Sequence, residues 1–293
     1  MAHATPVDGL NAASKAAVAA RRYLNARLAD LLREVPRLHG RAHTPLELEA
    51  VHDARVAVRR LRVALALFGA APEKVLRELA VLKRRAGAVR DLQLQLAKVQ
   101  AHSKRGAGRA QARALEPRLA GALRARIPKL REALRRFEAS LRHTLAHLAG
   151  RAAPKGKLGG RRLRRRLARR LVQADTLLRE ARQLEPETAH ALRRGLKRLR
   201  DEAELLLPAS PQALSTLARL IAPLQESLGL LHDADVHLAL LTEAGLDGAA
   251  SQVRRERAAL ARPLQAQLAG WSRSGRLLKL AKALREEKVA SRS

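Results

Sequence analysis

The chain has 293 residues, 47% of them apolar, which is long enough for one large domain or two smaller ones with a real core. It carries 59 Lys and Arg against 27 Asp and Glu, a formal net charge of +32. This excess strains a compact fold by self-repulsion and points to a polyanionic partner. A GC-rich genome would also enrich Arg and Ala, but such a bias does not decide on which helix face the Arg residues fall.

Several classes of protein are excluded by composition. Cysteine is absent, so the chain has no disulfide, thiolate nucleophile or Cys-ligated metal centre, which fits a reducing compartment. No signal-peptide pattern opens the chain, and no window approaches the roughly 20 apolar residues that cross a bilayer, so we expect a cytoplasmic protein without a membrane partner. The scarcity of aromatic residues disfavours single-stranded nucleic acid, whose bases stack on aromatic rings. The aromatic residues are Tyr23, Phe68, Phe137 and Trp271.

Apolar residues recur every three or four positions almost throughout, which predicts an all-α fold. Helix breaks are expected where Pro and Gly cluster. The segment PKGKLGG (154–160) is the best boundary between an N-terminal helical bundle over residues 10–150 and a C-terminal bundle over residues 160–285. The other expected breaks are residues 36–45, 69–74, 103–108, 207–211 and 244–248.

The helix predicted after residue 45 carries a row of cations beside its apolar face. At about 100° per residue, the apolar residues between Val51 and Phe68 gather on one face, which is the core side. The neighbouring face extends over roughly 15 Å without a carboxylate, since Asp53 falls on the far side. Like charges at this spacing destabilise a helix by a few tenths of a kcal/mol, so the row favours a surface for a polyanion. Its residues are His52, Arg55, Arg59 and Arg62.

The same row returns in the second half of the chain. Residues 52–68 align without gaps on the segment that begins at His190, and residues 82–96 align on residues 224–238. A solvated basic face is the alternative explanation for either row, but repetition in register disfavours it. We therefore predict a duplicated helical bundle, whose matched aspartates pair with and orient neighbouring arginines. The second row is His190, Arg193, Lys197 and Arg200, and the later matches are Gly87 with Gly229 and Asp91 with Asp233.

Two other patterns have functional alternatives. HDADVH (232–237) holds metal-ligand residue types, but His232 and His237 point about 140° apart on a helix and cannot close on one ion. RRLRRRLARR (161–170) predicts an amphipathic first helix of the second half, whose arginines form either a solvated face or an anion contact. No glycine-rich phosphate loop, nucleophile triad or pair of carboxylates placed for acid–base chemistry stands out. We expect a binding protein without a cofactor rather than an enzyme.

The pattern HxxRxxxRxLR, present twice in a basic helical chain, with an RD step at 90–91 and an HD step at 232–233, resembles the CHAD family, the conserved histidine α-helical domain. The resemblance covers nearly the whole chain, which is then a single CHAD-like domain over residues 1–293. The later motif differs between copies, because Gln225 and Glu226 stand where the first copy has Lys83 and Arg84. The two halves are therefore not expected to contribute equally.

The resemblance implies two antiparallel four-helix bundles related by a pseudo-twofold repeat, with the cationic helices lining a shared basic surface or channel. It implies binding of inorganic polyphosphate, and association with polyphosphate granules as in some members. A nucleic-acid-binding protein that reads phosphates without sequence preference is the alternative, because its electrostatics are similar. Carried over position by position, the resemblance marks as polyphosphate-binding residues His52, Arg55, Arg59, Arg62, Lys83, Arg90, His190, Arg193, Lys197, Arg200 and His232.

Overall fold

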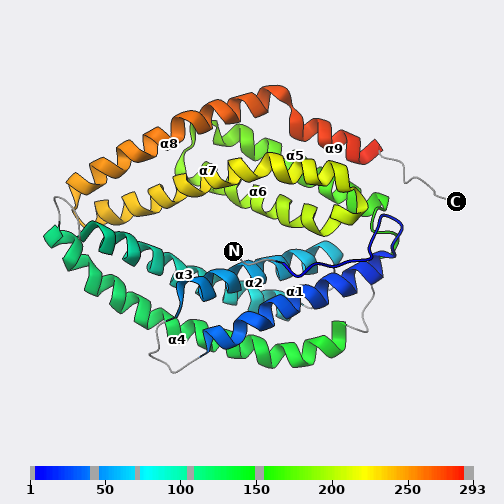
Figure 1. Ribbon diagram of the computed structural model, residues 1–293, viewed down its shortest axis with the longest axis horizontal. Helices are drawn as coiled ribbons and strands as arrows, with labels where there is room; N and C mark the ends of the chain where they lie inside the picture. Colours follow the sequence, from blue (N-terminus) through cyan, green and yellow to red (C-terminus); the bar gives the residue numbers. More distant parts are fainter. Residues whose placement is uncertain (1–3, 40–45, 70–72, 104–108, 149–154, 287–293) are drawn as a thin grey trace. The chain divides into compact units, whose positions relative to one another are not determined.

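The computed structural model describes residues 4–39, 46–69, 73–103, 109–148 and 155–286 (Figure 1). Within these ranges the regular secondary structure is helical, and only one isolated β-bridge forms, between Lys15 and Lys157. The prediction of an all-α fold is confirmed. None of the described helices combines the length and apolarity needed to cross a membrane.

The chain divides into two compact units, and a short N-terminal segment belongs to the second of them. Unit 1 comprises Met1–Gly9 and Ala16–Lys155, and unit 2 comprises Leu10–Lys15 and Gly156–Ser293. The amide of Leu158 donates to the carbonyl of Ser14 at 2.8 Å, and the amide of Gly159 donates to the carbonyl of Ala12 at 2.9 Å. A Cβ on Gly159 would lie 2.9 Å from the Cβ of Ala12, so this close approach requires glycine.

Unit 1 contains α1 (Ala16–Leu38), α2 (Leu48–Phe68), α3 (Glu73–Ser103) and α4 (Arg109–Leu148). Helix α2 packs against both α1 and α3, and α3 packs along α4. The α2 helix ends where Gly69 adopts a left-handed backbone with φ +68°, and its amide bonds to the carbonyl of Leu65 at 3.0 Å. The largest fully buried side chains of this unit are Leu31, Leu38, Leu65, Leu79, Leu82, Leu130, Leu134 and Phe137.

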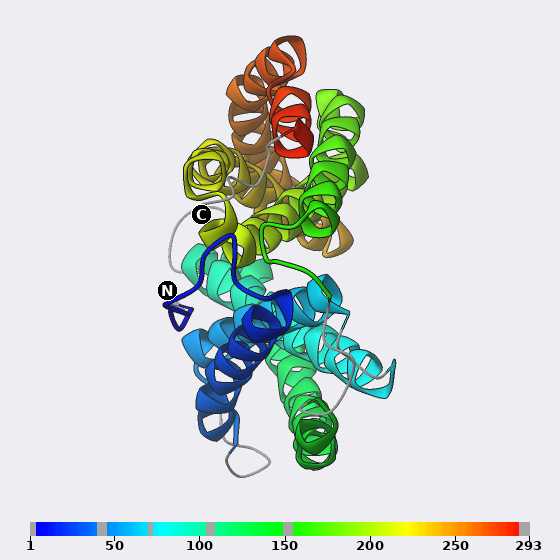
Figure 2. The ribbon, with the colours of Figure 1, turned by 90° about the vertical axis from the view of Figure 1, so that its right-hand side faces the viewer.

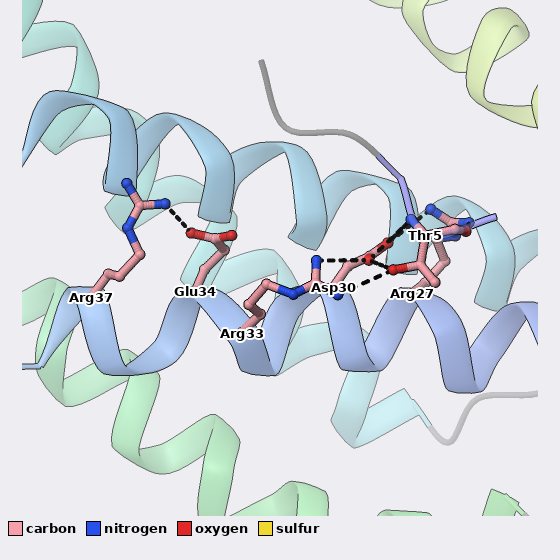
Figure 3. A network of polar contacts seen from close by, with 6 residues as sticks. All are labelled: Thr5, Arg27, Asp30, Arg33, Glu34 and Arg37. Atoms are coloured by element: carbon pink, nitrogen blue, oxygen red, sulfur yellow. Dashed lines mark hydrogen bonds and ion pairs between the residues drawn. The ribbon is translucent and has the colours of Figure 1, made fainter.

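A buried ion pair on α1 fixes the N-terminal segment of unit 1 (Figure 3). Arg27 Nη1 donates to Asp30 Oδ2 at 2.8 Å, and the two side chains are only 6% and 7% exposed. The Asp30 carboxylate also accepts from the amide of Thr5, at 3.2 Å, and from its hydroxyl. Arg27 donates to the Thr5 carbonyl in return, so both charges are paired and hydrogen-bonded.

Unit 2 contains a longer series of helices. Helix α5 packs against α6 and against α9, the red helix beside the green α5 in Figure 2, while α7 packs against α6 and α8. The series is α5 (Arg161–Glu180), the 3-10 turn η1 (Ala181–Gln183), α6 (Pro186–Leu206), the 3-10 turn η2 (Leu207–Ala209), α7 (Pro211–Glu243), α8 (Asp247–Ser274) and α9 (Arg276–Glu286).

The helix boundaries fall at every break that the sequence predicts, but unit 2 has two more. Between α5 and α6 the chain turns at Leu184, whose φ is +54°, and α6 then begins with Pro186 in its first turn. Proline suits that position because its missing N–H would have no intrahelical partner there. Helices α8 and α9 are separated at Gly275, which adopts φ +55°. Both breaks use a left-handed residue to reverse or bend the chain.

The Arg27–Asp30 pair gives a stability prediction. Replacing Asp30→Ala leaves the Arg27 guanidinium buried without its carboxylate, so we expect a loss of about 3–5 kcal/mol in the free energy of unfolding. Denaturant titration followed by circular dichroism measures this loss. The matched control is Asp8→Ala, which removes an exposed carboxylate from the same unit and is expected to change stability by less than about 0.5 kcal/mol. Equal losses in the free energy of unfolding in both variants would contradict a stabilising role for the Arg27–Asp30 pair.

Candidate functional site

The first cationic row lies on α2, on the flank of the helix that packs into the core. Val51 and Val58 are fully buried and Leu61 nearly so, as the apolar spacing predicts. Asp53 is turned toward α1, where its Oδ2 accepts from Arg37 Nη1 at 3.1 Å. The acid that follows His52 in the sequence thus joins two helices. All four residues of this row, hereafter the α2 stripe, are half-buried: His52, Arg55, Arg59 and Arg62.

Helix α3 brings further polar groups to the start of the α2 stripe. Arg55 Nη1 lies 3.4 Å from Asp91 Oδ1, which confirms the predicted pairing of that aspartate with a neighbouring arginine. Their side chains are 36% and 59% exposed, so the pair orients Arg55 more than it stabilises the fold. Arg90 Nη1 donates to the Leu48 carbonyl at 3.1 Å, which fixes this cation at the first turn of α2. Lys83 is exposed on α3.

The environment of His52 favours its neutral form. Burial lowers the pKa of His52 from its usual value, and the Arg90 and Arg55 cations lower it further, while Asp53 and Glu49 act in the opposite direction. A neutral imidazole can donate one hydrogen bond to an anion while adding no charge to the stripe.

The second cationic row lies on α6 and repeats the placement of the first. Leu192 and Leu196 on its core face are fully buried. The Arg193 guanidinium lies over Gly229 of α7: a Cβ built on that glycine would be 3.8 Å from Nε and 3.9 Å from Nη2. The arginine therefore lies across α7 at this position, at a distance where a Cβ would make ordinary van der Waals contact with it. The residues of this row, the α6 stripe, are half-buried: His190, Arg193, Lys197 and Arg200.

The end of the α6 stripe contacts a carboxylate of its own helix. Arg200 Nε donates to Glu204 Oε1 at 3.1 Å, one helical turn further along α6. Arg200 Nη1 also lies 3.3 Å from Gln225 Oε1 of α7, the residue that replaces the lysine of the first copy. The i,i+4 spacing of Arg200 and Glu204 was visible in the sequence, but the contact with Gln225 required the packing of α6 on α7.

Two histidines meet at the opposite end of the α6 stripe. The Nδ1 atoms of His190 and His232 are 3.3 Å apart, and the ring centroids are 4.5 Å apart with the planes tilted by 38°. Burial, the neighbouring His232 ring and the cations of α6 lower the pKa of His190 to about 4. The sequence marked both histidines, but it did not reveal that they touch.

Acids on the other side of α6 tie this helix to α5. Glu202 is 1% exposed, and its Oε1 lies 3.2 Å from Arg170 Nε and 3.7 Å from Arg166 Nη2. These contacts position α6 without drawing a carboxylate to its stripe. The outer face of α5 is different: its exposed arginines have no ion-pair partner in the described part of the chain. They are Arg161, Arg162, Arg165 and Arg169.

Each unit thus gathers its predicted residues on one helical hairpin, α2–α3 in unit 1 and α6–α7 in unit 2. Arg90 and His232 both lie beside the histidine that begins a stripe. The sequence did not identify Gly229 or Glu204 as neighbours of the arginines. The alignment of Gly87 with Gly229 was the one signal that pointed to Gly229. Within the described ranges, no group of three or more His, Asp or Glu is placed to hold a metal ion.

The geometry defines a class of protein: an all-helical chain with a cationic stripe beside the core of each unit. The family model for the CHAD domain matches residues 22–242. The chain belongs to the CHAD domain family. A search of the curated proteins finds no match.

Two solved structures share the fold. The crystal structure of the CHAD domain from the plant Ricinus communis is 22% identical, with 98% of this chain and 96% of that chain covered and a TM-score of 0.61. PptA from Streptomyces chartreusis is 19% identical, with 92% and 99% covered and a TM-score of 0.57. At these identities the similarity is one of fold.

The His190 environment predicts a pH effect on the stability of the free protein. Between pH 6.5 and 4 the unfolded chain binds a proton at His190 that the folded chain does not, so the free energy of unfolding falls as the pH falls through this range. The variant His190→Gln should show a smaller loss over the same interval. Denaturant midpoints measured at half-unit steps of pH test this, and an identical pH dependence in both proteins would contradict it.

Proposed function

We propose that this protein binds inorganic polyphosphate through the α2 and α6 stripes, without catalysis. The observation that carries the proposal is the position of the stripes: in each unit, four cationic or imidazole side chains follow one helix edge beside the core. Membership in the CHAD domain family, which is associated with polyphosphate binding, supports the choice of ligand.

The chemistry of the side chains suits a linear phosphate chain. Arginine keeps its charge at any physiological pH and offers forked donors that pair with two phosphate oxygens. Half-burial fixes the stems of these side chains, so less conformational entropy is lost when the ligand binds. A stripe of roughly 15 Å spans several phosphate groups, and each contact releases counterions from the ligand.

Neighbouring groups orient the arginines before the ligand arrives. Asp91 holds Arg55 from α3, and Arg193 lies against Gly229 of α7. Arg200 is held between Glu204 and Gln225, so its guanidinium is oriented at the end of the α6 stripe. The proposal places the phosphate chain along Arg193, Lys197 and Arg200 in unit 2. It also includes a cytoplasmic location and association with polyphosphate granules.

Charge-matched variants test whether the stripe, rather than total charge, binds the ligand. Replacing Arg55, Arg59 and Arg62 together by Gln removes three cations from the α2 stripe. At roughly 1 kcal/mol or more per charge-assisted hydrogen bond, we expect the Kd for long-chain polyphosphate to rise at least about tenfold at near-physiological salt. Isothermal titration calorimetry measures the change, and circular dichroism checks that helicity is retained.

The control variant carries the same change of charge on α5. Arg162, Arg165 and Arg169 are exposed and have no ion-pair partner in the described ranges, so replacing all three by Gln removes no structural contact. Its Kd is expected to change less than about threefold, because only diffuse charge is lost. Equal losses of affinity in the two triple variants would show that the +32 charge acts as a whole, and the stripe would no longer be the site.

A further inference from the structure

The residue that lies beside the histidine of each stripe differs in charge between the two units. In unit 1 the group from α3 beside His52 is Arg90, which is charged at every physiological pH. In unit 2 the group from α7 beside His190 is His232, and its charge depends on pH. The second hairpin therefore holds an ionisable pair where the first holds a permanent cation.

The contact between the two imidazoles limits how many protons the pair holds. At 3.3 Å the two Nδ1 atoms are within hydrogen-bond distance, so two neutral rings are bonded in the tautomer that has a hydrogen on one Nδ1. A first added proton goes to the Nε2 of the donor ring, which keeps this hydrogen bond. A second would place hydrogens on both Nδ1 atoms, facing each other. The pair therefore accepts one proton readily and a second one only by breaking the contact.

The charged neighbours of the pair oppose even that first proton in the free protein. On α6 the charged groups that act on His190 are cations, and Glu187 lies one turn before it at the start of the helix. On α7, Asp235 is paired with Arg257 of α8, and Asp233 follows His232. Arg182 of η1 donates to Ser272 of α8. The α5 arginines that contact α6 pair with Glu202, which lies about three helical turns beyond His190. The cations that act on His190 are Arg193, Arg194 and Lys197.

We propose that the His190–His232 pair makes phosphate binding by unit 2 proton-coupled: the pair is neutral in the free protein and takes up one proton from solvent when a phosphate chain lies on the α6 stripe. The inference rests on the proposed function and adds its regulation. The bound anion offsets the field of the α6 cations, and the new Nε2–H is a further donor for a phosphate oxygen. Affinity then increases as the pH falls, by up to about tenfold per pH unit where one proton is taken up.

Calorimetry in several buffers counts the proton directly. Long-chain polyphosphate, whose interior groups stay ionised, is titrated into the full-length protein at pH 6 in buffers of different ionisation enthalpy, with a chelator present to remove metal ions. The slope of the observed enthalpy against the buffer enthalpy is the number of protons taken up. The same titration is made with the double variant His190→Gln/His232→Gln and with His232→Arg, which gives unit 2 the arrangement of unit 1. The matched control is His39→Gln, whose imidazole contacts Glu138 in unit 1 and leaves the pair intact.

The expected result is a proton uptake lower by about one in the double variant and in His232→Arg than in the unchanged protein and in His39→Gln. The double variant still binds through the cations of the stripes, with a higher Kd because it lacks the imidazole donor. Proton uptake that is the same in the double variant and the unchanged protein would overturn the inference while leaving polyphosphate binding in place. Absence of binding at every pH in the unchanged protein would instead overturn the proposed function, and the inference with it.

Discussion

The repulsion between like charges at helical spacing is the constraint on which the rest of this structure depends. Each stripe places several cations along one edge of α2 or α6, a pattern that destabilises an isolated helix. The fold tolerates it because the adjoining face of each helix is buried: Val51 and Val58 in unit 1, Leu192 and Leu196 in unit 2. Burial of these apolar side chains contributes far more than the repulsion costs, at roughly 1.5–3 kcal/mol per large side chain.

The acids of the chain are distributed so that they hold helices together away from the stripes. Asp53 pairs with α1, Glu202 with α5, and Asp235 with α8. Asp91 and Glu204 do contact stripe arginines, each from a partly exposed position. The two hairpins thus have the same arrangement but differ in charge. In the first, the permanent cation Arg90 lies beside the stripe histidine. In the second, His232 takes that place, and Arg200 is paired with Glu204.

Much of the fold and the composition of the stripes could be predicted from the sequence, because helical periodicity and Pro/Gly clusters are local signals. The break at Leu184 was missed because no glycine marks it. The assignment of residues 10–15 to unit 2 depends on backbone hydrogen bonds between distant segments, which no local pattern encodes. The contact of His190 with His232 likewise depends on how α6 packs on α7. The alignment matched His232 with Arg90, but it could not predict that His232 lies within contact distance of His190.

The central claim is that the stripes form a shaped site for a flexible phosphate chain rather than a diffuse cationic surface. The most direct measurement is a titration with long-chain polyphosphate at near-physiological salt, competed by duplex DNA and by RNA at equal phosphate concentration. The account predicts that both nucleic acids need at least about tenfold more phosphate to displace half of the bound polyphosphate, a difference of about 1.4 kcal/mol. Displacement at equal phosphate concentration would contradict the account and favour a nucleic-acid-binding protein.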